Sequence, residues 1–109
     1  MKVYLSNAFS LTMIKEFPVV LGIKEIELKR AKYILQYGFI SAVGHEETAK
    51  ILSEKLGIEV PFNRISITIE FGDILIVAQL MGERKPFKEM TREEIEKYPI
   101  KFFEISIIE

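Results

Sequence analysis

The chain has 109 residues, 49% of them hydrophobic and 28% charged, which predicts a single domain spanning residues 1–109 with a core of its own. A formal net charge of −1 argues against a protein that coats duplex DNA. The absence of cysteine excludes disulfides, a catalytic thiolate and thiolate metal ligands. No apolar run reaches membrane-spanning length and no signal peptide is recognisable, so we expect a cytoplasmic protein without membrane contact.

The first 37 residues contain two predicted strands and two predicted helices. Residues 2–5 alternate as a short strand, and Ser10 is placed to cap a brief helix over residues 11–17. Residues 19–23 are β-branched enough for a second strand. Residues 27–37 carry apolar side chains at helical spacing, which predicts an amphipathic helix.

The middle of the chain is organised around one strand and one helix. Residues 39–43 have the composition of a short buried strand, and Gly44 interrupts it. A helix is then predicted to open at His45 and to end at Gly57, because glycine is the usual C-terminal cap. A connector containing Pro61 follows.

The remaining residues complete the sheet. Clean alternation predicts a strand with one solvent-facing side at residues 64–70, and the continuous apolar run 74–78 predicts a central strand. Residues 79–89 have the composition of a charged loop, and residues 91–98 open with a capping box. Residues 100–108 form the last predicted strand. The fold class is therefore α/β or α+β, with a mixed sheet of about five strands flanked by three or four helices.

His45 is the only histidine, and it stands where a strand and Gly44 lead into a helix. Free N–H groups at a helix N-terminus attract anions, and histidine is the side chain that titrates near neutral pH. The pattern suggests proton transfer beside a phosphate, although by itself such a histidine is more often without chemistry. The alternative is a helix N-cap or a half-buried histidine without chemistry. With one histidine and no cysteine, we expect no metal and no other cofactor.

Four segments in order resemble the viral ring nuclease family, anti-CRISPR proteins of archaeal and bacterial viruses with relatives in type III CRISPR loci. They are K-V-Y-L-S-N-A-F-S at 2–10, S-A-V-G-H-E-E-T-A at 41–49, N-R-I-S-I at 63–67 and G-D-I-L-I-V-A-Q at 72–79. The resemblance implies a homodimeric, metal-independent phosphodiesterase that cleaves cyclic tetra-adenylate to linear di-adenylate with a 2′,3′-cyclic phosphate. Such an enzyme switches off type III CRISPR signalling in the host cytoplasm and needs no DNA or protein partner.

The resemblance also implies roles for individual residues. His45 falls on the catalytic histidine, and Arg84 on an arginine that clamps the scissile phosphate, with Lys85 adding positive charge. Arg64 falls on a basic residue for a ring phosphate or a base edge. The implied substrate-binding residues also include those of the N-A-F-S turn, the glycine before the histidine and the glutamine that ends the apolar strand: Asn7, Ser10, Gly44 and Gln79.

The loop at 82–88 departs from the family pattern. Relatives commonly carry a catalytic glutamate where this chain has Phe87. Either Glu83 or Glu89 then substitutes for it, or the 2′-hydroxyl is activated by position alone. For the other residues the plainer readings are a turn former at Asn7 and a solvated charged loop at 84–85.

Two other functions stay open. The absent loop glutamate favours a sponge that binds cyclic oligoadenylate without cutting it. A dimeric nucleic-acid-binding viral regulator is the third reading, against which the near-neutral charge counts.

Overall fold

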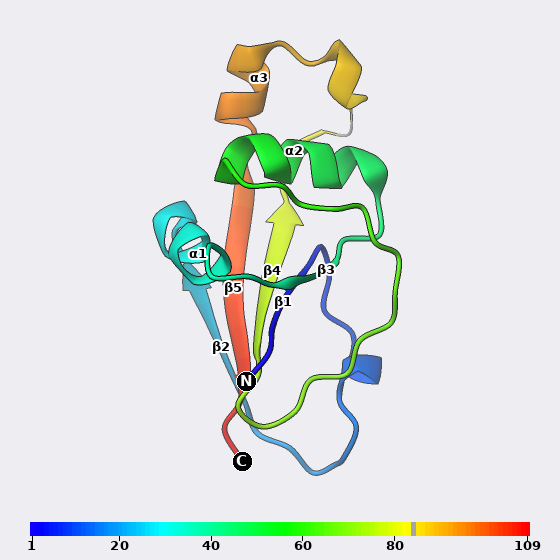
Figure 1. Ribbon diagram of the computed structural model, residues 1–109, viewed down its shortest axis with the longest axis vertical. Coiled ribbons are helices and arrows are strands. Elements are labelled where there is room, and N and C mark those ends of the chain that lie inside the picture. The colour runs from blue at the N-terminus through cyan, green and yellow to red at the C-terminus, as the bar shows by residue number, and fades with distance from the viewer. Residues whose placement is uncertain (84) are drawn as a thin grey trace.

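A five-stranded mixed sheet forms the centre of the structure, a computed structural model that describes residues 1–83 and 85–109 (Figure 1). The strands lie in the order β2-β5-β4-β1-β3. Their bounds are β1 Val3–Ser6, β2 Leu21–Ile26, β3 Ile40–Ala42, β4 Ile74–Leu80 and β5 Ile100–Ile107. Strand β1 is parallel to β3 and β4, whereas β5 is antiparallel to β2 and β4. The α+β fold class with about five strands is confirmed.

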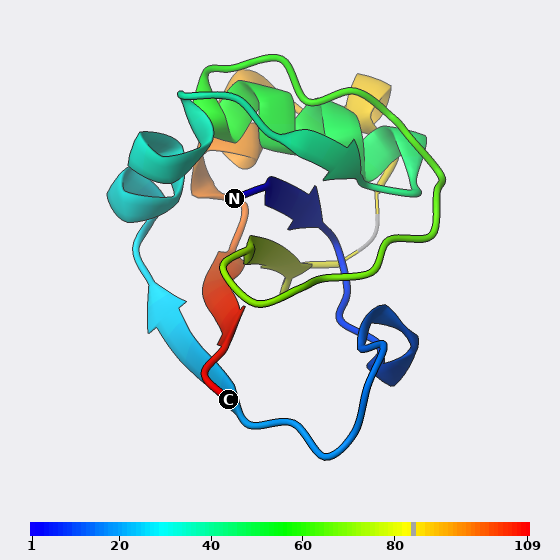
Figure 2. The same ribbon diagram turned by 60° about the horizontal axis from the view of Figure 1, so that its bottom comes forward.

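Helices α1 (Leu28–Leu35) and α2 (Glu46–Leu56) cover one face of this sheet, and the short α3 (Arg92–Lys97) lies beyond the end of the sheet (Figures 1 and 2). The larger core cluster fills the space between the two long helices and the sheet, with Leu5, Leu52, Leu56 and Ile76 fully buried. Burial of such side chains stabilises the fold by about 1.5–3 kcal/mol each.

The helix termini follow the local signals in the sequence. Gly57 ends α2 in the left-handed region with φ 69°, where a residue with a Cβ would be strained. Thr91 and Glu94 form the predicted capping box of α3, with Glu94 N–H donating to Thr91 Oγ1 at 3.1 Å. Ser10 caps the 3₁₀ helix η1 (Leu11–Met13) by accepting from Thr12 N–H at 3.3 Å.

The predicted strand at residues 64–70 is wrong. Its residues form no strand of the sheet, and its one β-bridge, between Ile69 and Ile14, lies outside the five strands. The alternating apolar residues still face the core, because Ile67 and Ile69 are buried in a second core cluster on the sheet face opposite α1 and α2. Alternation specifies an extended segment with one apolar side. It does not specify whether the backbone of that segment pairs with a strand of the sheet or whether only its side chains pack against the sheet.

Three elements differ most from the bounds that the sequence predicted. The helix predicted over 11–17 is a single 3₁₀ turn, because the chain leaves it at Ile14 to bridge with Ile69. Strand β2 occupies residues 21–26 and not 19–23. Strand β4 continues into the predicted loop through Leu80, since pairing with β5 extends to that residue. That loop also contains the 3₁₀ helix η2 (Phe87–Glu89).

Within the described residues, no helix is both long and apolar enough to cross a membrane.

Candidate active site at the carboxyl ends of the parallel strands

The three mutually parallel strands β1, β4 and β3 end at the same edge of the sheet. Asn7 follows β1 directly, Gln79 is the penultimate residue of β4, and Gly44 lies two residues beyond β3. The carboxyl ends of parallel strands are the usual place for ligands in open sheets, since loops and helix N-termini converge there. Three residues far apart in the sequence are thereby brought to one edge.

Asn7 and Gly44 are joined by a hydrogen bond. The Gly44 N–H donates to Asn7 Oδ1 at 3.2 Å. The turn after β1 is held separately, because Ser6 Oγ donates to the carbonyl of Ala8 at 2.9 Å. Asn7 therefore does more than form its own turn, since it connects β1 to the segment that opens α2.

His45 occupies the N-cap position of α2, but its side chain makes no capping hydrogen bond. Its backbone is extended, with φ −129° and ψ 124°, and the residue is exposed. The imidazole is neither buried in the core nor used to cap the helix. His45 is thus the N-cap residue by position, as one reading of the sequence without chemistry allowed, and its imidazole is exposed and not bonded to the helix.

A cavity of about 510 Å³ opens beside His45. This volume lies within the range of about 300–1,000 Å³ typical of ligand sites. Four of the predicted site residues line it, namely Asn7, His45, Gln79 and Lys85. The rest of the lining consists of Glu46, Glu47, Thr48, Ile51, Leu80, Gly82, Pro86 and Tyr98.

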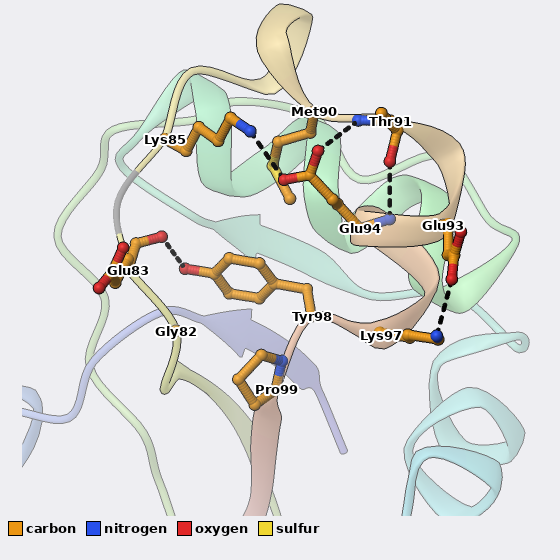
Figure 3. A pocket seen from close by; sticks show the side chains of 10 residues that line it. All are labelled: Gly82, Glu83, Lys85, Met90, Thr91, Glu93, Glu94, Lys97, Tyr98 and Pro99. Atoms are coloured by element: carbon orange, nitrogen blue, oxygen red, sulfur yellow. Dashed lines mark hydrogen bonds and ion pairs between the residues drawn. The ribbon is translucent and has the colours of Figure 1, made fainter.

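The charged groups of this lining have mixed signs. Glu46 pairs with Lys50 at 3.7 Å along the helix, while the Glu47 carboxylate accepts a hydrogen bond from the N–H of Phe87. Lys85 points to Glu94, with 2.8 Å between Nζ and Oε2 (Figure 3). That ammonium, followed by the N–H of Thr91, holds the pKa of the Glu94 carboxyl below its ordinary value.

Arg64 lies beside the cavity and does not line it. Its Cγ is 3.5 Å from where a Cβ on Gly44 would stand. The neighbouring Asn63 is fixed to β3, because its backbone N–H donates to Val43 O at 2.9 Å and its Nδ2 donates to Ser41 O at 2.8 Å. These bonds bring the connector, and with it Arg64, to the same edge as His45.

Two predicted residues lie apart from the cavity. Ser10 caps the N-terminus of η1, where its Oγ accepts from the Thr12 N–H and also forms a hydrogen bond with Thr12 Oγ1 at 3.0 Å. Glu89 lies at the end of η2 and is absent from the cavity lining. Arg84 is outside the described residues.

Two of the other residues of the cavity wall, Glu47 and Tyr98, make contacts that the sequence did not indicate. Glu47 stands in the first turn of α2, two residues after His45, where the sequence indicates only a carboxylate that suits the helix dipole. Tyr98 carries no local signal at all, because it reaches the cavity only through the pairing of β5 with β4. Among the described residues, no group of three metal-ligating side chains is close enough to hold an ion.

The structure is that of an α+β protein with a cavity of about 510 Å³ at the carboxyl ends of its parallel strands. A sequence model of the STIV B116-like family matches residues 3–103, and the chain belongs to that family. The structure is similar to that of B116 of Sulfolobus turreted icosahedral virus, with a TM-score of 0.86 and 26% identity over 97% of this chain and 99% of that one.

Two further relatives also come from archaeal viruses. "Uncharacterized protein 26" of Sulfolobus islandicus filamentous virus (isolate Iceland/Hveragerdi) is 39% identical over 108 residues, which cover 94% of this chain and 90% of that protein. "Uncharacterized protein ORF117" of Acidianus two-tailed virus is 38% identical over 61 residues, 53% of this chain and 52% of that protein. The chain is thus a member of a family of archaeal virus proteins.

Proposed function

We propose that this protein is a metal-independent phosphodiesterase that cleaves cyclic tetra-adenylate and thereby antagonises type III CRISPR signalling. The observation that carries the proposal is the placement of His45, whose side chain does not cap its helix and lines a cavity of about 510 Å³. The resemblance of the sequence to viral ring nucleases supplies the substrate.

The proposed step is a transesterification that needs no external nucleophile. The 2′-oxygen of one ribose attacks the adjacent phosphorus, so that the P–O2′ bond forms while the P–O5′ bond breaks. Protonated His45 gives its proton to the departing 5′-oxygen, and the 2′-hydroxyl proton passes to water. Two such cuts across the ring produce two di-adenylates, each ending in a 2′,3′-cyclic phosphate. General acid catalysis of this kind contributes about 10²–10⁴-fold in rate.

The other predicted residues of the cavity provide complementary groups. Asn7 and Gln79 offer amide donors and acceptors for adenine edges or ribose hydroxyls. Lys85 offers a positive charge for a phosphate, and in the structure it is paired with Glu94 at 2.8 Å. Both partners of that pair are more than 40% exposed, so the pair is weak and a substrate phosphate can replace the carboxylate.

The proposed active form is a homodimer, and one part of the sheet suits a second copy. Ile23 on β2 is 57% exposed, and it is paired with Ile105, which belongs to the core cluster opposite the helices. Leu21, Phe103 and Ile107 on the same face are only partly buried. A two-fold axis running along the strands would place the two cavities at the same end of the dimer, each facing one half of the ring.

Product analysis tests the proposal. The protein is incubated with cyclic tetra-adenylate in excess chelator, and the products are resolved by chromatography and mass spectrometry. We expect the product to be di-adenylate ending in a cyclic phosphate. It should form at the same rate with and without chelator. If the ring stays intact and the protein does not bind it, the proposal is overturned.

One observation favours a sponge as the second candidate. Of the two described carboxylates of the cavity, Glu47 already accepts a hydrogen bond from the N–H of Phe87, which leaves only Glu46, exposed and in a weak pair with Lys50 at 3.7 Å, to take the 2′-hydroxyl proton. Retention of the intact ring at one ring per dimer, without cleavage, would support the sponge over the enzyme. Salt-sensitive binding of DNA in place of the ring would support a nucleic-acid-binding regulator.

A further inference from the structure

Glu47 joins two segments that are far apart in the sequence. Its carboxylate, in the first turn of α2, accepts a hydrogen bond from the N–H of Phe87 at the start of η2. The neighbouring Glu46 does not make such a contact, since its carboxylate pairs with Lys50 on the same helix at 3.7 Å. Glu47 therefore connects the helix that carries His45 to the stretch of chain that supplies Gly82, Lys85 and Pro86 to the cavity wall.

The same wall is held at a second point. Tyr98 Oη donates to the carbonyl of Glu83 at 3.1 Å (Figure 3). Gly82 lies so close to the Tyr98 ring that a Cβ there would stand 2.9 Å from Cζ. The side chain of Tyr98 is buried, with 8% of its surface exposed, so this end of the wall rests on a fixed support.

Lys85 and Pro86 stand between these two points of attachment and line the cavity. Lys85 also lines a neighbouring cavity of about 450 Å³, in which its ammonium meets Glu94 (Figure 3). The Lys85 side chain therefore has two directions open to it.

We propose that Glu47 is a positioning residue of this site: its bond to the Phe87 N–H holds Lys85 and Pro86 against the N-terminus of α2, so that Lys85 can turn from Glu94 toward a phosphate beside His45. A hydrogen bond to a carboxylate is stronger than one between neutral groups. The kinetic part of this inference rests on the proposed phosphodiesterase function. The structural part does not.

Loss of the attachment moves Lys85 away from the phosphate without removing any group that takes part in bond breaking. A phosphate contact made equally in the ground state and the transition state affects KM more than kcat. In Glu47→Ala we therefore expect KM to rise about tenfold with a smaller change in kcat. Glu47→Gln keeps an oxygen acceptor for the Phe87 N–H, and it should restore most of the lost affinity.

The experiment compares Glu47→Ala, Glu47→Gln and the control Glu54→Ala, which removes an exposed carboxylate of α2 outside the cavity. Amide hydrogen exchange at Phe87 is measured by NMR beside the kinetics. We expect exchange at Phe87 to accelerate about tenfold or more in Glu47→Ala, and to stay near the wild-type rate in Glu47→Gln and Glu54→Ala.

Two results would overturn the inference. Unchanged exchange at Phe87 in Glu47→Ala would show that the carboxylate does not hold the wall. Loss of kcat in Glu47→Gln with Phe87 still protected would make Glu47 a catalytic residue and not a positioning one. If the wild-type protein leaves cyclic tetra-adenylate intact, the proposed function fails, while the exchange measurement still decides whether Glu47 holds Phe87.

Discussion

Asn7 Oδ1 accepts a hydrogen bond from the N–H of Gly44 at 3.2 Å, across 37 positions of the sequence. This bond joins the end of β1 to the residue immediately before His45. The position of the imidazole therefore depends on the side chain of Asn7, which follows β1, as well as on helix α2.

The first prediction concerns this bond. Replacing Asn7 with alanine removes the acceptor from the Gly44 N–H and should lower the free energy of unfolding by about 1 kcal/mol. Asn7→Asp keeps a side-chain oxygen at the same place and is the matched control. Urea unfolding of the two variants checks the difference. Equal stability of Asn7→Ala and wild type would show that the bond contributes nothing.

The second prediction separates catalysis from binding at His45. Because the imidazole does not cap α2, His45→Ala should change the free energy of unfolding by no more than about 0.5 kcal/mol. Cleavage of cyclic tetra-adenylate should fall about 10²–10⁴-fold while the ring still binds. Single-turnover kinetics and calorimetric titration measure the two quantities. A fully active His45→Ala protein would exclude the proposed proton transfer.

The third prediction compares two glycines at the site. A Cβ at Gly82 would lie 2.9 Å from Tyr98 Cζ and 3.1 Å from Pro99 Cδ, where ring atoms cannot easily move aside. Gly82→Ala should therefore destabilise the fold by about 1–3 kcal/mol. At Gly44 the nearest atom is Arg64 Cγ at 3.5 Å, an ordinary contact, so Gly44→Ala should be tolerated. Thermal unfolding of both variants tests the contrast.

The fourth prediction follows from Glu94. Its pKa is lowered below the ordinary value of 4.5, first by the hydrogen bond from Lys85 and then by that from the Thr91 N–H. A carboxyl with a depressed folded-state pKa binds its proton more readily in the unfolded chain. Its contribution to stability is thus present above the ordinary pKa and is lost as the pH falls through the folded-state pKa.

The comparison that tests this is between wild type and Glu94→Gln. The wild-type protein should be the more stable at neutral pH, and the difference in melting temperature should narrow below about pH 4.5. In a Lys85→Ala background the pH dependence of that difference should be smaller, because the largest cause of the shift has been removed. A difference that does not vary with pH would contradict the assignment.

The fifth prediction concerns the proposed dimer. Ile23→Lys places a charge on the apolar part of the sheet face and should weaken association by about 2 kcal/mol or more. Tyr37→Lys changes another exposed side chain, 76% exposed and just after α1, and should leave the mass in solution unchanged. Light scattering over a range of concentrations measures both. A dimer of normal stability in Ile23→Lys would place the interface elsewhere.

Local signals predicted those parts of the fold that depend on neighbours in the chain. The capping box at Thr91 and the left-handed Gly57 were recognisable because each satisfies backbone groups of its own helix. The apolar run of β4 was predicted as a central strand, and β4 does lie between β5 and β1; it is apolar throughout because both faces of the sheet are covered. Ile67 and Ile69 gave the correct buried side of their segment but not its pairing.

By itself the sequence determined which residue types stand at helix ends, which strand is buried on both faces, and that the single histidine opens a helix. Only the tertiary structure decided that Asn7, Gln79 and Lys85 line one cavity with His45, and that Glu47 reaches Phe87. The physical reason is the range of the interactions. Capping and periodicity act within a few residues, whereas strand order and the bonds between loops depend on pairings across the whole chain.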